Sequence, residues 1–139
     1  MSTLHANRRL WQKHVLAENR RSIEGLLETL CAEPVYTVMA SGDEYRGREA
    51  VAGFYRGLFE AMPDATFDLV TAVIGEEGVV EESVLRGTPI HDFLGCPPTG
   101  RAIAMPLTIV FPMRAGEILG ERLYFDLETV RRQLAGSAH

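Results

Sequence analysis

The C-terminal third of the chain carries an aspartate in a setting that suits acid–base chemistry. In a β-strand over residues 118–125, alternate side chains point to opposite faces. One face would carry Ile118, Gly120, Arg122, Tyr124 and Asp126, and the other Leu119, Glu121, Leu123, Phe125 and Leu127. Asp126 beside Tyr124 in an enclosed apolar site would have its pKa raised by desolvation, which fits a general acid or base. The alternative is a capping role, because Asp126 directly precedes a helical pattern at Leu127.

A second pair with chemical potential lies near the N-terminus. His14 and Glu18 are four residues apart, so a helix places both side chains on one side, which Trp11 shares. They could form a histidine–carboxylate dyad at a pocket, with His14 as proton shuttle or orienting donor. A structural pair is the competing interpretation. A metal site would need a third ligand, for which His91 is the candidate.

Further polar and aromatic side chains could bind a ligand. In the strand-like segment 79–88, consecutive glutamates send one carboxylate to each face, and the alternation favours Glu81 and Ser83 as the inward pair. Aromatic residues that could surround a cavity are Trp11, Tyr36, Tyr45, Phe54, Tyr55, Phe59 and Phe93. Together they indicate a flat, apolar ligand, although each one taken singly is a candidate core residue.

The elements that must position these residues follow from periodicity and turn signals. The sequence predicts a long helix over residues 4–32 that ends before Pro34, a small hairpin over 35–45, and a second helix over 47–62. Strands follow at 66–74, 79–88, 101–113 and 118–125, and then a short closing helix at 127–134 and a tail that includes His139. Helices followed by antiparallel strands predict an α+β fold, with a curved sheet around the first helix.

Length and charge narrow the possible partners. The 139 residues are enough for one domain, 1–139, with a substantial core. A net charge of −5 disfavours nucleic-acid binding, which needs clustered Lys and Arg. No apolar run reaches the length of a transmembrane helix, so we expect no membrane partner. No signal-like segment is present, so Cys31 and Cys96 are expected to be free thiols in the cytoplasm.

Several motifs occur in an order typical of one known family. They are His14-x-x-x-Glu18-Asn19, Tyr45-Arg46-Gly47-Arg48, Phe93-Leu94-Gly95-x-Pro97-Pro98-Thr99-Gly100-Arg101 and Glu121-Arg122-x-Tyr124-Phe125-Asp126. With these motifs the chain resembles the SnoaL-like polyketide cyclases of the NTF2-like superfamily. The resemblance covers nearly the whole sequence. It implies an NTF2-like cone, a homodimer, and cofactor-independent chemistry without a metal.

The resemblance also implies residue roles. SnoaL-like cyclases use an aspartate at the position of Asp126 as the acid–base group for an intramolecular aldol closure. From the residues themselves, we expect His14 with Glu18 to assist or orient, and Tyr124 to donate a hydrogen bond to a developing oxyanion. The hypothesis is therefore a cyclase or isomerase acting on an apolar carbonyl compound. The alternative is a non-catalytic ligand-binding and dimerisation module, with the apolar face of Leu119, Leu123 and Phe125 as its contact.

Overall fold

The computed structural model describes residues 2–136, and His139 lies outside this range. The elements are α1 (Thr3–Asn19), α2 (Ile23–Glu28), β1 (Leu30–Val38), β2 (Asp43–Arg46), α3 (Arg48–Ala61), β3 (Thr66–Gly75), β4 (Gly78–Gly87), β5 (Ile103–Arg114), β6 (Glu117–Tyr124) and α4 (Leu127–Ala135). The strands form one six-stranded sheet in the order β2-β1-β6-β5-β4-β3. All neighbouring strands are antiparallel except β1 and β6, which run parallel. The predicted α+β class is confirmed, with a mixed sheet instead of a purely antiparallel one.

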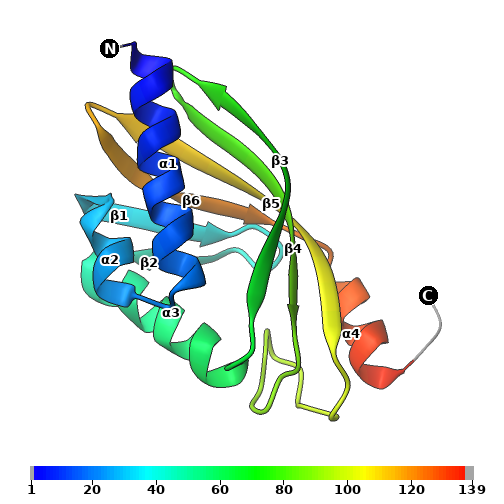
Figure 1. The fold of residues 1–139 in the computed structure, drawn as a ribbon. Coiled ribbons are helices and arrows are strands. Elements are labelled where there is room, and N and C mark those ends of the chain that lie inside the picture. The colour runs from blue at the N-terminus through cyan, green and yellow to red at the C-terminus, as the bar shows by residue number, and fades with distance from the viewer. Residues whose placement is uncertain (1, 137–139) are drawn as a thin grey trace.

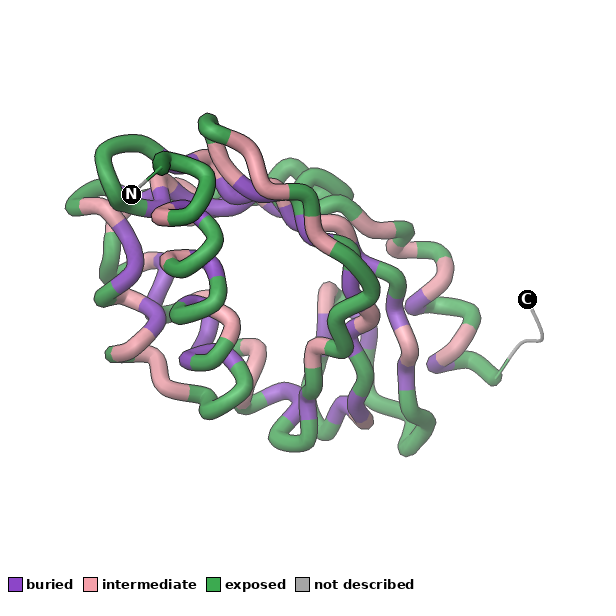
Figure 2. The backbone as a smooth tube through the Cα atoms, turned by 45° about the horizontal axis from the view of Figure 1, so that its top comes forward, coloured by how far each residue is buried: buried purple, intermediate pink, exposed green. Residues whose placement is uncertain are grey.

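The sheet curves, and helices α1, α2 and α3 lie on one side of it, whereas α4 packs against β5 away from them (Figure 1). Buried segments of the sheet and of the three helices face one another across this interior (Figure 2). None of the helices within residues 2–136 is long and apolar enough to cross a membrane.

The expectation of a single helix over residues 4–32 is wrong. Helix α1 ends at Asn19, and Arg21 follows with a φ of 55° in the left-handed region, which a helix cannot contain. The Ser22 side chain then accepts from the Gly25 N–H and starts the short helix α2. Pro34 does not terminate a helix. It lies inside β1, where the pairing with β6 is irregular between Leu30 and Val35, and such an irregularity tolerates a missing N–H.

Side-chain hydrogen bonds from helix α1 to the β3–β4 hairpin fix the helix on the sheet. Asn7 donates from Nδ2 to the carbonyl oxygens of Gly75 and Glu76, at 2.9 and 3.1 Å, in the turn between β3 and β4. About one turn further along, Trp11 donates from Nε1 to Glu81 on β4 at 2.9 Å. The C-terminal half of α1, which carries His14 and Glu18, is thereby held over the middle of the sheet.

Strand β4 follows the predicted alternation. Val79, Glu81, Ser83 and Leu85 are buried on the side of α1, whereas Val80, Glu82 and Arg86 are exposed.

Strand β6 does not follow the alternation, because its register with β5 shifts between Val110 and Met113. One additional residue of β6 is accommodated near Gly120, whose φ is 152° and where a Cβ would clash with the Val35 carbonyl oxygen. Past this bulge, Glu121, Leu123 and Phe125 point inward while Arg122 and Tyr124 point outward.

Candidate functional site

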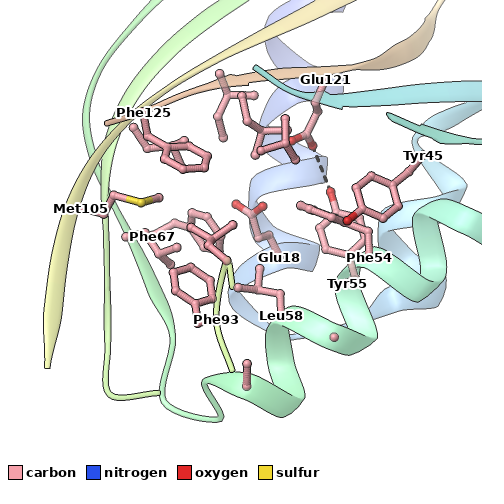
Figure 3. Close-up of a pocket in the computed structure, with 18 of the residues that line it drawn as sticks. Glu18, Tyr45, Phe54, Tyr55, Leu58, Phe67, Phe93, Met105, Glu121 and Phe125 are labelled. Atoms are coloured by element: carbon pink, nitrogen blue, oxygen red, sulfur yellow. Dashed lines mark hydrogen bonds between the residues drawn. The ribbon is translucent and has the colours of Figure 1, made fainter. Parts of the chain in front are cut away.

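A cavity of about 160 Å³ lies between helices α1 and α3 and the concave face of the sheet (Figure 3). Most of its wall is apolar and aromatic. The lining residues are Glu18, Val38, Tyr45, Phe54, Tyr55, Gly57, Leu58, Ala61, Phe67, Leu85, Asp92, Phe93, Leu94, Met105, Leu107, Ile109, Glu121, Leu123 and Phe125. Such a wall, broken by a few acidic and phenolic groups, is typical of a small-molecule site.

Glu18 is the polar group most directly presented to this cavity (Figure 3). It lies in the last turn of α1, and the residue is 4% exposed. Its carboxyl group makes no hydrogen bond to any residue within 2–136, yet no fully enclosed side-chain oxygen in that range lacks a partner. The Glu18 carboxyl therefore borders the open space of the cavity. Burial raises its pKa well above the ordinary 4.5, and the nearby carboxyl groups of Glu121 and Glu81 raise it further.

His14 does not pair with Glu18. Its Nε2 lies 2.9 Å from Oε2 of Glu121, which comes from β6, and both side chains are fully buried. Its Nδ1 lies 2.7 Å from the Thr29 hydroxyl, which itself donates to the Leu26 carbonyl at 2.6 Å. The two elements that sequence analysis treats as separate motifs, α1 and β6, thus meet through one histidine–carboxylate contact.

Two tyrosines extend this chain of hydrogen bonds towards α3 and β1. Tyr55 donates to Glu121 Oε2 at 2.9 Å, and its hydroxyl oxygen lies 2.5 Å from that of Tyr36. Burial raises the pKa of both phenols well above 10.0, and the neighbouring Glu121 raises it further. Both phenols therefore stay neutral, so they can serve as hydrogen-bond donors.

A third buried carboxyl lies beneath the first half of α1. Glu81 accepts from Trp11 Nε1 and from the Ser83 hydroxyl, at 2.9 and 3.0 Å. Burial raises the Glu81 pKa above 4.5, against the opposing effect of these two donors. Trp11, Glu81 and Ser83, which were all predicted to bind a ligand, point into the interior, as expected for Glu81 and Ser83. None of the three lines the cavity.

Asp126 and Tyr124 lie elsewhere than predicted. Asp126 is exposed and is the N-cap of α4, where it accepts from the Glu128 N–H at 3.0 Å and from the Thr129 hydroxyl at 3.1 Å. Tyr124 is 41% exposed. The β6 bulge turns both side chains away from the cavity, so the capping interpretation of Asp126 describes its place in this structure.

The same bulge changes the role of the apolar strand face. Leu123 and Phe125, expected to contact a cover or a second subunit, line the cavity instead. Of the other predicted ligand-binding residues, Phe54 and Tyr55 line the cavity, and Tyr36 lies directly behind Tyr55.

Metal-ligating groups also meet here. Among residues 2–136, His14, Glu18 and Glu121 each place one ligand atom within 4.8 Å of the others. His91, the third ligand suggested by sequence, is exposed and is not in this group. His14 Nε2 and Glu121 already hydrogen-bond each other, so a cation would have to displace their proton.

Glu121 is the principal residue that sequence reasoning missed. A signal was present, because Glu121 is the one charged side chain among Leu119, Leu123, Phe125 and Leu127 on the apolar face. A lone carboxylate at such a position requires a buried partner. Thr29 carried no comparable signal, because its role depends on where α2 ends.

The sequence also matches a family of known proteins. Residues 6–134 match the SnoaL-like polyketide cyclases. The chain belongs to the SnoaL-like polyketide cyclase family. Among curated proteins, none matches the sequence.

Solved structures confirm the predicted NTF2-like fold. A protein from Jannaschia sp. CCS1 assigned to the SnoaL-like polyketide cyclases superimposes with a TM-score of 0.85 at 20% identity, over 96% of this chain and 94% of that one. IdmH from Streptomyces antibioticus, assigned as a polyketide cyclase, gives 0.78 at 26% identity, over 93% and 98%. A Catenulispora acidiphila protein with a ketosteroid isomerase-like fold, in complex with trimethylamine, gives 0.78 at 19% identity, over 93% of each chain.

Proposed function

We propose that this protein catalyses proton transfer at the carbon next to a carbonyl group in a small apolar molecule, leading to ring closure or isomerisation. The observation that carries the proposal is the Glu18 carboxyl, which borders the cavity without a hydrogen-bond partner within residues 2–136. The assignment of related structures as polyketide cyclases supports a carbonyl-bearing substrate.

The surroundings of Glu18 suit a general acid–base group. An acid–base catalyst works best when its pKa lies near the working pH. Burial among apolar side chains moves the Glu18 pKa from 4.5 in that direction. A carboxyl that no protein donor holds is also free to exchange its proton with a ligand.

The proposed step balances in atoms and electrons. The Glu18 carboxylate takes a proton from the carbon next to the carbonyl, and the C–H electron pair moves into the enolate. In a ring closure, that pair forms a C–C bond to a second carbonyl carbon, and the resulting alkoxide takes the proton back from Glu18. In an isomerisation, the proton returns to a different carbon. Neither route consumes an oxidant or a reductant.

A phenol on the cavity wall would stabilise the enolate oxygen. The Tyr55 hydroxyl already donates to Glu121, whereas the Tyr45 hydroxyl makes no hydrogen bond to a residue within 2–136. We assign Tyr45 as the donor to the developing oxyanion. Asp126, which the family resemblance favours as the acid–base group, and Tyr124, predicted as the oxyanion donor, lie outside the cavity in this chain.

Exchange of carbon-bound hydrogen tests the proposal without knowledge of the natural substrate. Cyclopentanone in D₂O is followed by ¹H NMR with the wild type, with Glu18→Gln and with Glu82→Gln, which alters an exposed carboxyl on the outer face of β4. We expect the wild type and Glu82→Gln to accelerate exchange equally, and Glu18→Gln to fall to the rate in buffer. Equal rates for wild type and Glu18→Gln would contradict the proposal.

A binding-only module is the alternative function. It predicts that cyclopentanone shifts the NMR signals of cavity residues in the wild type, while its own hydrogens exchange no faster than in buffer.

A further inference from the structure

The cavity next to Glu18 is smaller than the usual site of a drug-sized ligand. A cavity of about 150 Å³ accommodates a benzene-sized molecule, and the present one measures about 160 Å³. Drug-sized ligands occupy about 300–1,000 Å³. The inner chamber, as we call this cavity, therefore holds about one ring and its substituents.

A second pocket begins where the inner chamber ends. This outer pocket, of about 410 Å³, lies over the β1–β2 turn and the start of α4. Its lining residues are Val38, Ala40, Ser41, Asp43, Tyr45, Phe54, Leu94, Gly95, Phe125 and Leu127. Five of these also line the inner chamber, namely Val38, Tyr45, Phe54, Leu94 and Phe125. The two spaces thus share one apolar boundary, made largely of aromatic rings.

The backbone at this boundary fixes the position of one side chain. Leu94 has a φ of 53°, which a residue with a Cβ rarely adopts, and Gly95 follows with a φ of 78°. The bridge between Phe93 and Cys96 closes this turn, with reciprocal backbone hydrogen bonds of 2.9 Å. Leu94 lines both spaces, as does the ring pair Tyr45 and Phe54, whose centroids lie 5.0 Å apart.

The outer pocket ends in polar groups. Ser41 and Asp43 are exposed, and the Ser41 hydroxyl donates to the Asp43 carboxylate at 2.9 Å. An apolar passage that opens onto such a pair suits a molecule whose far end is polar or solvated.

On the basis of the proposed function, we propose that Leu94 and the outer pocket select substrates by the length of the chain attached to the reacting end. The ring-sized reacting end of the substrate occupies the inner chamber beside Glu18, and the chain passes Leu94 into the outer pocket. Leu94 is then a specificity-determining residue, because it contacts the substrate where the chain leaves the chamber.

Another pocket adjoins the inner chamber on the side of the loop before β5. It measures about 510 Å³ and includes Glu60, His91 and Pro98, but it shares only Gly57, Ala61 and Asp92 with the chamber. This shared boundary offers an apolar chain little contact. It nevertheless supplies a matched control, because a bulky side chain can be placed on either side.

The test compares a short and a long methyl ketone. Dissociation constants of 2-pentanone and 2-nonanone are measured by NMR titration for the wild type, for Ala40→Trp in the outer pocket, and for Glu60→Trp on the loop side. 2-Nonanone carries four more methylenes than 2-pentanone, and each buried methylene is worth about 0.8 kcal/mol, so we expect the wild type to bind 2-nonanone roughly 200-fold more tightly when all four are buried. Ala40→Trp should abolish most of this preference and leave 2-pentanone binding unchanged, while Glu60→Trp should retain it.

Each other outcome overturns a defined part of the account. No chain-length preference in the wild type, or a preference that Ala40→Trp retains, overturns the outer-pocket proposal and leaves the role of Glu18 intact. Loss of the preference in Glu60→Trp alone would place the chain on the loop side, which also overturns it. Failure of both ketones to bind the wild type would contradict the proposed function itself.

Discussion

Nδ1 of His14 lies 2.7 Å from the hydroxyl oxygen of Thr29, and the Thr29 hydroxyl donates its one hydrogen to the Leu26 carbonyl. Thr29 can therefore only accept from His14, so Nδ1 must carry a hydrogen. Nε2 then faces Oε2 of Glu121 at 2.9 Å. The end of α2 thus orients the ring of a histidine on α1, and through it the contact with a carboxyl on β6.

Removing the Thr29 hydroxyl should leave the Nδ1–H of His14 buried without an acceptor. We expect Thr29→Val to lower the free energy of unfolding by about 1–3 kcal/mol, the cost of an unsatisfied buried donor. Thr71→Val, on the exposed face of β3, is the matched control and should change it by less than about 0.5 kcal/mol. Urea unfolding measures the free energy of unfolding of both variants. Equal changes in the two variants would show that the contact between His14 and Thr29 does not contribute to stability.

Breaking the His14–Glu121 pair should lower the free energy of unfolding more than Thr29→Val does, because the remaining partner stays buried in the core. Removing one member of a buried pair typically costs about 3–5 kcal/mol. We expect Glu121→Leu to reach this range, while Glu117→Leu, at the exposed start of β6, stays close to the wild type. A double-mutant cycle with His14→Leu should give a coupling of about 0.5–3 kcal/mol, and additive effects would contradict the pairing.

The raised pKa of Glu18 predicts how stability depends on pH. Above pH 4.5 the unfolded state has released a proton that the folded state keeps, so the free energy of unfolding falls as pH rises through the folded-state pKa. Glu81 acts in the same direction. Glu18→Gln cannot titrate, so its stability should fall less steeply between about pH 5 and pH 8. Denaturant unfolding across this range measures the two slopes, and parallel curves would rule out a desolvated Glu18.

Asp126 should affect stability and leave the chemistry unchanged. Because Asp126 is the N-cap of α4, we expect Asp126→Ala to lower the free energy of unfolding by about 0.5–2 kcal/mol. Asp126→Asn should lower it little, since asparagine also caps helices well. Both variants should retain the cyclopentanone exchange rate of the wild type. A large loss of exchange in Asp126→Asn, with stability unchanged, would restore the catalytic role that the family resemblance suggests.

Local patterns predicted the parts of this fold that depend on neighbours in sequence. The alternation of β4 correctly placed Glu81 and Ser83 inward, because that strand pairs with β5 without a register shift. The helix over residues 47–62 was predicted nearly to its ends, and α3 runs from Arg48 to Ala61.

Features that depend on distant contacts were beyond the sequence patterns. The bulge near Gly120 exists because β6 pairs with both β1 and β5, and it reverses which residues face the cavity. The partner of His14 in the structure is Glu121, 107 residues away, whereas helical spacing suggested Glu18. Periodicity finds which residues are buried more readily than which buried residues meet.

The central claim is that the Glu18 carboxyl is a desolvated acid–base group facing the ligand. ¹³C NMR of the side-chain carboxyl, assigned by its loss in Glu18→Gln, measures its titration directly, and the pH dependence of cyclopentanone exchange is recorded alongside. The account predicts a Glu18 midpoint well above 4.5 that coincides with the midpoint of the exchange rate. A Glu18 midpoint at or below 4.5, or an exchange profile that survives in Glu18→Gln, would contradict it.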